Sequence, residues 1–163
     1  MSWYVVADFF EVKGGTITRL ISDKALPALK TLCEGYRLPE QISEIKLSDG
    51  VETEIKTMLT EKDDSKIEFF NQKSFETYLD VVKEEYKMKA LEYFRKSEAV
   101  NLIEYMKLSD EEKENVDSSI TDAREDVEYL EGKIHCLTSV LGIFEMLEFN
   151  HSGSICMAVS FDY

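Results

Sequence analysis

Apolar residues recur through the C-terminal half of the chain at the spacing of a two-stranded coiled coil. Between residues 116 and 144, nine apolar positions follow alternating steps of four and three. These positions, here called the heptad seam, are Val116, Ile120, Ala123, Val127, Leu130, Ile134, Leu137, Leu141 and Phe144. The spacing predicts one long helix over about 109–148. Ser109 followed by Glu112 predicts a capping box at its start.

The C-terminal end of this predicted helix has a wider apolar surface than the seam alone provides. Four further apolar residues lie outside or beside the seam, namely Val140, Ile143, Met146 and Leu147. A helix that is apolar on several sides is buried on several sides. We therefore expect this end to enter the main core.

A second helix is predicted just before the first. Residues 74–107 contain no glycine or proline, and Phe75, Leu79, Val82 and Tyr86 follow helical spacing. The pattern blurs near Ser97, where we expect a kink or a new helix start. The two segments, about 74–107 and 109–148, predict a long antiparallel helical hairpin. The sequence leaves open whether this pairing occurs within one chain or, through the heptad seam, in a homodimer.

Both ends of the chain predict β-strands. Two runs rich in β-branched and aromatic residues flank Gly14 and Gly15, which indicates a β-hairpin because glycine adopts the positive φ of tight turns. Residues 154–161 alternate apolar and small polar side chains, which predicts a last strand with one buried face. We expect an α+β fold, in which the N-terminal hairpin and the C-terminal strand form a small antiparallel sheet.

The region between the N-terminal hairpin and the helices has weaker signals. Asp23 predicts the cap of a helix over about 24–36, and residues 66–70 predict a short strand. Residues 49–60 favour a short helix, with a hairpin of 42–47 and 51–57 as the alternative. The 163 residues are expected to form a single domain. Its head would comprise 1–72 and 150–163, and its helical hairpin 74–148.

Negative charge is concentrated in one part of the chain. The net charge is −14, and residues 104–131 hold eleven acidic residues against three basic ones. Eight of the acidic residues lie outside the heptad seam: Glu111, Glu114, Asp117, Asp122, Glu125, Asp126, Glu128 and Glu131. Side chains three and four apart on a helix lie about 5–6 Å from each other, a spacing comparable to that of DNA phosphates. The alternative interpretation is the solvated exterior of a coiled coil.

The candidate catalytic residues are few. His135 is next to Cys136, but neighbours on a helix point about 100° apart and cannot act as a pair. His151 lies in a turn that we expect Asn150 or Gly153 to cap, although a chemical role for His151 stays open. The chain has no phosphate-binding glycine motif and no zinc-ligand spacing. We therefore expect a protein that is not an enzyme and that binds no cofactor or metal.

Cysteine content and hydropathy indicate the compartment. Cys33, Cys136 and Cys156 are widely spaced and odd in number, which favours reduced thiols in the cytoplasm. The longest apolar stretch, 136–144, is too short to cross a bilayer. Adjacent aromatic pairs such as Phe9–Phe10 cannot both face one core if they lie on strands.

The charge defines the kind of partner to expect. A strongly acidic chain repels nucleic acid and anionic membranes, so we expect a protein partner with a basic surface, no direct nucleic-acid binding and no membrane binding. In composition the chain resembles small acidic inhibitors, such as phage anti-defence (anti-CRISPR) proteins and bacterial toxin-immunity proteins. The hypothesis is therefore a DNA-mimicking inhibitor that occludes the cationic site of a nuclease or nucleic-acid-binding effector. The alternatives are a toxin-immunity protein and a helical-hairpin scaffold or oligomer subunit.

Overall fold

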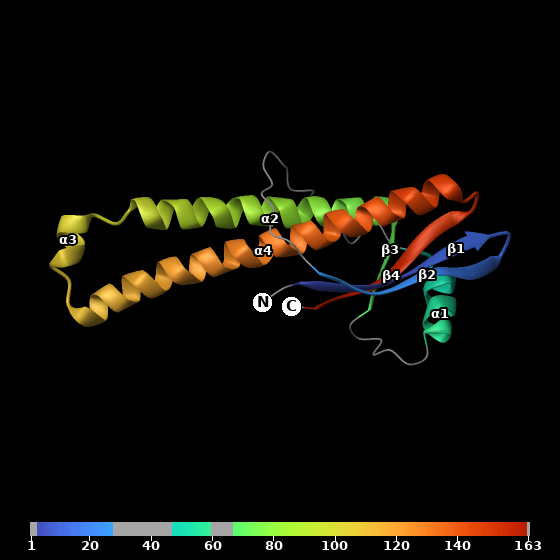
Figure 1. Ribbon diagram of the computed structural model, residues 1–163, viewed down its shortest axis with the longest axis horizontal. Coiled ribbons are helices and arrows are strands. Elements are labelled where there is room, and N and C mark those ends of the chain that lie inside the picture. Colours follow the sequence, from blue (N-terminus) through green and yellow to red (C-terminus); the bar gives the residue numbers. More distant parts are fainter. Residues whose placement is uncertain (1–2, 28–46, 60–66, 163) are drawn as a thin grey trace.

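The computed structural model describes residues 3–27, 47–59 and 67–162. In chain order the elements are β1 (Tyr4–Lys13), β2 (Thr16–Pro27), α1 (Asp49–Met58), β3 (Glu68–Asn71), α2 (Gln72–Glu98), α3 (Leu102–Met106), α4 (Asp110–Asn150) and β4 (Ser154–Asp162). The strands form one antiparallel sheet in the order β2-β1-β4-β3. The predicted α+β class, built from both ends of the chain, is confirmed (Figure 1).

The sheet is centred on the pair formed by β1 and β4. Gly14 and Gly15, with φ of +58° and +79°, form the turn between β1 and β2, as the hairpin prediction requires. Strand β1 also pairs with β4 over nine residues, and Phe9 lies opposite Met157. The expected strand near 66–70 is β3, which pairs with the other edge of β4.

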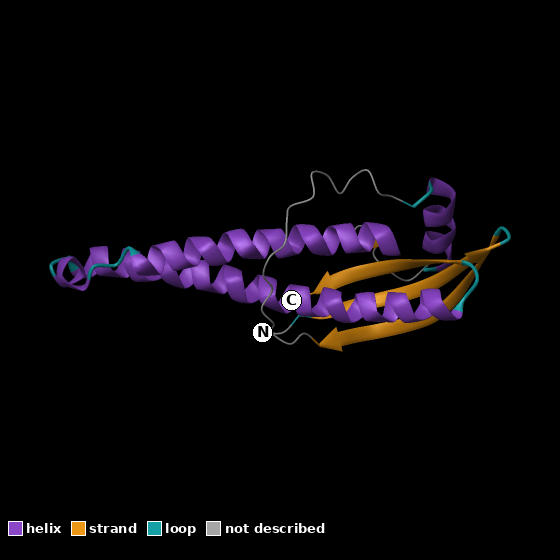
Figure 2. Cartoon of the chain, turned by 90° about the horizontal axis from the view of Figure 1, so that it is seen from above, coloured by secondary structure: helices purple, strands orange, loops and turns teal. Residues whose placement is uncertain are grey.

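Helices cover both faces of the sheet, with α2 and α4 on one side and α1 on the other (Figures 1 and 2). Phe9 packs edge-on against Phe144 of α4, whereas Phe10 lies in the cluster formed with Ile55 of α1. Adjacent residues on a strand point to opposite faces, so the aromatic pair serves two cores.

The prediction of one buried face for the last strand is wrong. Met157 and Val159 lie in the core beneath the helical hairpin, and Cys156 and Ala158 lie in the core beneath α1. The alternation along β4 is one of side-chain size, with the smaller Cys156 and Ala158 on the side of α1. From the sequence, the small side chains on the Cys156 and Ala158 side of β4 indicate a solvated face.

The helical hairpin forms within the chain. Buried seam residues of α4, among them Val127 and Ile134, share one core with Leu79 and Val82 of α2. With 41 residues, α4 is about 60 Å long, and the hairpin extends well beyond the sheet (Figure 1). The first helix ends at Glu98, and α3 begins after the new cap Asn101. The single helix predicted over 74–107 is therefore two helices, and the predicted interruption near Ser97 is confirmed.

Two further expectations for helices can be compared with the described residues. The helix predicted over 24–36 is wrong for residues 24–27, which belong to β2, and the remainder lies outside the described residues. There Leu26 pairs with Val5, and Pro27 is tolerated because β2 is an edge strand. The short helix predicted near 49–60 is confirmed as α1, so the alternative hairpin is wrong.

The C-terminal end of α4 enters the core on fewer sides than expected. Val140 and Leu147 are buried, but Met146 is 51% exposed and Phe149 is 90% exposed. The prediction that all the added apolar positions are buried is therefore wrong for Met146. Among the described elements, the sheet and α2 pack against this end of α4, on the side that carries Val140 and Leu147. Among the described helices, none combines the length and apolar character needed to cross a bilayer.

Candidate functional site: the acidic face and the tip of the hairpin

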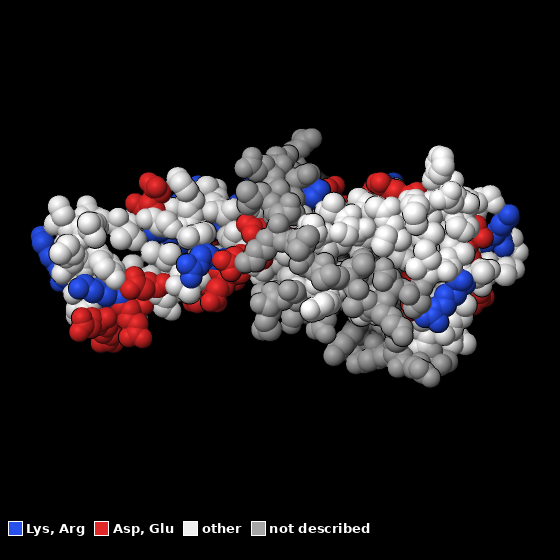
Figure 3. Space-filling view, in the orientation of Figure 1, with Lys and Arg blue, Asp and Glu red and all other residues white. Residues whose placement is uncertain are grey.

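Five of the eight predicted acidic residues lie on the side of α4 opposite the heptad seam, as helical spacing dictates. This set, here called the acidic outer face, comprises Glu111, Glu114, Asp122, Glu125 and Glu128. Glu128 is half-buried and the other four are exposed. Figure 3 shows acidic side chains gathered where α4 begins and along the adjoining edge of the hairpin. The seam packs against α2, so the same helix that is anchored on one side presents carboxylates on the other.

The other three predicted acidic residues flank the seam and contact neighbouring helices. The Tyr105 hydroxyl of α3 donates to both carboxylate oxygens of Asp117, at 2.8 and 3.0 Å. Tyr86 of α2 donates to Glu131 at 3.2 Å. The eight predicted acidic residues therefore fall into two groups, because the carboxylates of Asp117 and Glu131 have hydrogen-bond partners inside the hairpin.

Asp126 is the third of these residues. Its carboxylate lies 3.7 Å from the ammonium group of Lys89 on α2. Both side chains are substantially exposed, so the pair is worth little in stability. Its effect is to neutralise one charge at the edge of the acidic outer face.

The density of charge along this helix approaches that of a nucleic-acid strand. Residues 110–131 contain ten acidic residues and two basic ones, and they span about 32 Å at 1.5 Å per residue. Counted around the whole helix, that is one carboxylate per ~3 Å, against one phosphate per ~3.4 Å in a DNA strand. The acidic outer face alone presents one carboxylate per ~6 Å. Within the described part of the chain, no basic side chain forms an ion pair with Glu111, Glu114 or Glu125.

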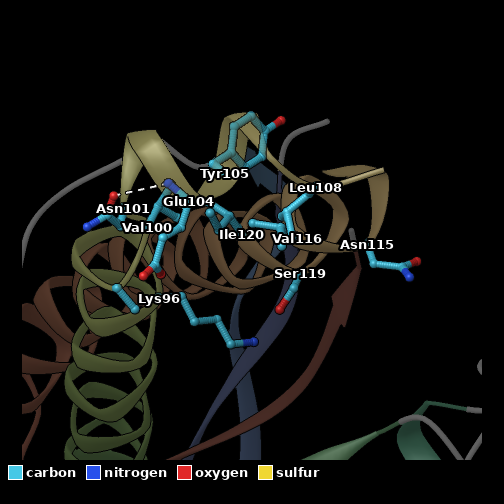
Figure 4. Close-up of a pocket in the computed structure, with 11 residues that line it drawn as sticks. Lys96, Val100, Asn101, Glu104, Tyr105, Leu108, Asn115, Val116, Ser119 and Ile120 are labelled. Atoms are coloured by element: carbon cyan, nitrogen blue, oxygen red, sulfur yellow. Dashed lines mark hydrogen bonds between the residues drawn. The ribbon is translucent and has the colours of Figure 1, made fainter. Parts of the chain in front are cut away.

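A cavity lies at the tip of the hairpin, where the heptad seam loses its partner. Here α2 ends at Glu98, and the first two seam residues, Val116 and Ile120, are only half-buried. The cavity between them and α3 has a volume of about 480 Å³ and is also lined by Val100 and Leu108. Figure 4 shows Val116 and Ile120 of α4 between Val100 and Leu108. We call this space the tip cavity.

Helix α3 forms one wall of the tip cavity and carries its own exposed apolar surface. The Asn101 side chain caps it by accepting from the backbone N–H groups of Ile103 and Glu104. Leu102, Ile103 and Met106 are each 69% exposed, and α3 has no buried residue. The hydrogen bond from Tyr105 therefore has an important share in holding α3 on α4, and it raises the pKa of the Tyr105 hydroxyl.

The tip cavity was not among the sequence predictions. Its lining mixes apolar residues with polar ones such as Asn101, Asn115 and Ser119 and carries no recognisable motif, and the heptad spacing predicts Val116 and Ile120 as ordinary seam positions. One available signal was the expected interruption near Ser97, since a shortened first helix must leave the start of the second without a mate. The sequence does not show which side of the gap α3 occupies.

The histidine and cysteine side chains considered as candidates occupy positions that stabilise the fold. His151, and neither Asn150 nor Gly153, is the cap residue of α4, and its Nδ1–H donates to the Leu147 carbonyl at 2.9 Å. The thiols of Cys136 and Cys156 are buried, which raises the pKa of each to about 11. A thiol is a weak nucleophile at such a pKa.

Lys133 is the most unusual cation of the described residues. Its ammonium group lies 5.1 Å from the centre of the Tyr78 ring, 5.6 Å from that of Trp3 and 5.9 Å from that of Phe161. Burial lowers the pKa of Lys133, while the ring faces stabilise its charge. This arrangement anchors the N-terminal strand region to α4. Across the described ranges, no three histidine, cysteine or acidic side chains gather as a metal site would require.

No protein-family model, curated protein or solved structure matches this chain. The functional argument therefore depends on the geometry and charge of the acidic outer face and of the tip cavity.

Proposed function

We propose that this protein is a non-enzymatic acidic binding protein that inhibits a basic partner by covering its cationic site. The observation that carries the proposal is the acidic outer face, which presents exposed carboxylates along a helix held rigid by its seam. Like charges at helical spacing cost stability, and no ion pair within the described residues offsets that cost for Glu114 or Glu125. A basic partner would offset it.

The partner class follows from the spacing of the charges. A groove that binds a nucleic-acid backbone presents a row of lysine and arginine to successive phosphates, and the acidic outer face presents a row of carboxylates, one per ~6 Å along α4. The proposed partner is a nuclease or a nucleic-acid-binding effector, and the proposed mechanism is DNA mimicry of the anti-defence type. Complementary fields accelerate such association and make it sensitive to salt. A toxin-immunity protein would use the same mechanism on a different target.

A second candidate is a helical-hairpin scaffold or oligomer subunit, favoured by the exposed apolar side chains of α3. Most of the seam is already filled within the chain, since Ala123, Val127 and Leu130 are buried. A second copy that pairs along the seam would therefore reach only its first positions, Val116 and Ile120. The two candidates differ in their response to charge changes.

The test is an affinity capture from nuclease-treated lysate at low and high salt. The charge variant carries Glu111→Lys, Glu114→Lys, Asp122→Lys and Glu125→Lys. The matched control carries four charge reversals at exposed positions elsewhere: Glu54→Lys, Glu76→Lys, Glu98→Lys and Glu145→Lys. Both variants have the same net charge, so only the location of the change differs.

The expected result is a basic nucleic-acid-binding protein that the wild type and the control retain and the charge variant does not. Salt should release it, duplex DNA should compete with it, and its purified activity should fall when wild-type protein is added. Equal retention by the charge variant and the control would refute the proposed function. An oligomer that forms in all three proteins would favour the scaffold.

A further inference from the structure

The tip cavity is the unfilled end of a helix-packing surface. In the hairpin the seam residues from Val127 onward share one core with α2, whereas Val116 and Ile120, near the end of α2, lie outside that core and line the tip cavity. A heptad seam presents holes shaped for side chains of an opposing helix. The exposed apolar surface here therefore has the form of a helix-binding groove, and its 480 Å³ is within the usual ~300–1,000 Å³ of binding pockets.

The charges around this groove define what can enter it. Residues 101–114 contain five acidic residues and two lysines, of which Lys113 lies over the Tyr105 ring at 5.8 Å. The cavity wall itself holds Glu104 and Lys96, and the Lys96 ammonium group is paired with Glu92 at 3.3 Å. The first turn of α4 carries Asp110, Glu111 and Glu112. Two copies meeting tip to tip would bring these carboxylates together, and an anionic lipid surface would be repelled in the same way.

We propose that the tip cavity receives the apolar side chains of an amphipathic helix that carries lysine or arginine beside its apolar stripe. This inference rests on the proposed function, because the helix would belong to the same basic partner. The first turn of α4, with Asp110, Glu111 and Glu112, lies about one helical turn before the cavity residue Asn115, so lysines of a helix seated in the cavity can contact these carboxylates. The rest of the acidic outer face lies on the opposite side of α4 and attracts the helix through its longer-range field. The carboxylates attract the helix and speed association, and the buried apolar side chains slow its release.

The test uses two synthetic peptides in place of the unidentified partner. One is a helix of leucine and lysine with leucine at both seam positions of each heptad. The other has alanine in place of each leucine, with the same length and charge. Affinities are measured at several salt concentrations, and methyl NMR shifts of the protein show where each peptide binds.

Four variants separate the contributions. The tip variant carries Val100→Ser and Val116→Ser. In case these changes loosen the hairpin, Ser119→Phe fills the cavity without removing an apolar residue. The control carries Met146→Ser and Phe149→Ser, which remove exposed apolar side chains at the opposite end of α4.

The acidic-face variant carries Glu111→Gln, Glu114→Gln and Glu125→Gln. We expect wild type and the control to prefer the leucine peptide by about tenfold, with shifts at the Val100, Val116 and Ile120 methyls. Both tip changes should remove that preference. The acidic-face variant should bind both peptides more weakly and with less salt dependence, while it keeps the preference.

The failures of the two proposals are distinguishable. A leucine preference that survives both tip changes, or methyl shifts confined to other regions, would overturn the tip inference and leave the charge-based function standing. Unchanged affinity of the acidic-face variant would overturn the proposed function and the basic character assigned to the helix. A wild type that dimerises through the tip, with monomeric tip variants, would identify a second copy as the occupant and refute the proposal.

Discussion

The contact between Gly132 and Trp3 provides a sharp test of how the N-terminus is held on α4. A Cβ atom at position 132 would lie 2.6 Å from Cδ1 of the Trp3 ring. Trp3 is buried, and its Nε1–H donates to the Tyr129 carbonyl at 2.6 Å. A Gly132→Ala substitution must therefore push the indole ring away from the helix. Gly142 lies in the same helix with nothing within 4 Å of its added Cβ, so Gly142→Ala is the matched control.

The expected magnitudes follow from two opposing terms. Either substitution gains about 0.5–1 kcal/mol because alanine favours the helix interior over glycine. At Gly132 the overpacking of a fitted site costs about 1–3 kcal/mol. Complete loss of Trp3 burial, with ~150–250 Å² at ~25 cal/mol per Å², sets an upper bound of about 4–6 kcal/mol. We expect Gly132→Ala to lower the free energy of unfolding by about 1–2 kcal/mol and Gly142→Ala to raise it by about 0.5–1 kcal/mol.

The assay is urea unfolding monitored by fluorescence. Trp3 is the single tryptophan of the chain, so its emission reports directly on the contact. The native emission of Gly132→Ala should move to longer wavelength, as the ring becomes more exposed to water, and that of Gly142→Ala should not. Equal stabilisation by both substitutions, with unchanged native emission, would refute the packing of Trp3 on Gly132.

Three further predictions concern other contacts. Burial raises the pKa of the Cys136 and Cys156 thiols from 9.0 to about 11. The free energy of unfolding, measured by urea titration, should therefore be fully retained below pH 9 and should decline from pH 9 to 11, and the decline should be shallower when either cysteine is replaced by alanine. A free energy of unfolding that does not change between pH 9 and 11 would contradict this prediction. Arg19→Met leaves the buried carboxylate of Asp8 without its ion pair at 3.0 Å. It should lower the free energy of unfolding by about 1–3 kcal/mol, and Asp8→Leu should restore most of this loss in the double variant. Tyr105→Phe removes the hydroxyl that holds α3 on α4, so amide exchange should accelerate in α3 alone; exchange as slow as in wild type would show that other contacts position α3.

Local patterns predicted the elements with the strongest periodicity. The steps of four and three along the seam and the cap at Ser109 placed α4 correctly, because both act over a few residues. The Ser109 side chain accepts from the Glu112 N–H at 3.2 Å and its hydroxyl donates to the Glu112 carboxylate. Gly14 and Gly15 located the hairpin for the same local reason.

The errors occurred where a neighbouring element outweighed a local preference. The segment after Asp23 has a helix-start signal, yet residues 24–27 extend β2 because β1 continues beside them and offers backbone hydrogen bonds. The small side chains of β4 suggested a solvated face, but α1 covers that face. Neither neighbour can be identified from the residues that were misassigned.

The candidate site shows the same division. The concentration of carboxylates after Ser109 was evident in the sequence, and helical spacing alone places Glu114 and Glu125 opposite the seam. Whether Asp117 or Glu131 would be free depended on Tyr105 and Tyr86, which approach from other helices. The tip cavity depended on the residue at which α2 ends.

The sequence by itself determined the heptad seam, the acidic outer face, the turn at Gly14 and Gly15 and the α+β class, because each arises from residues a few positions apart. Only the tertiary structure decided which face of β4 is covered, which carboxylates have partners and where the seam is left open. These properties depend on long-range packing, in which the free energy of burying a surface is set by the element that covers it.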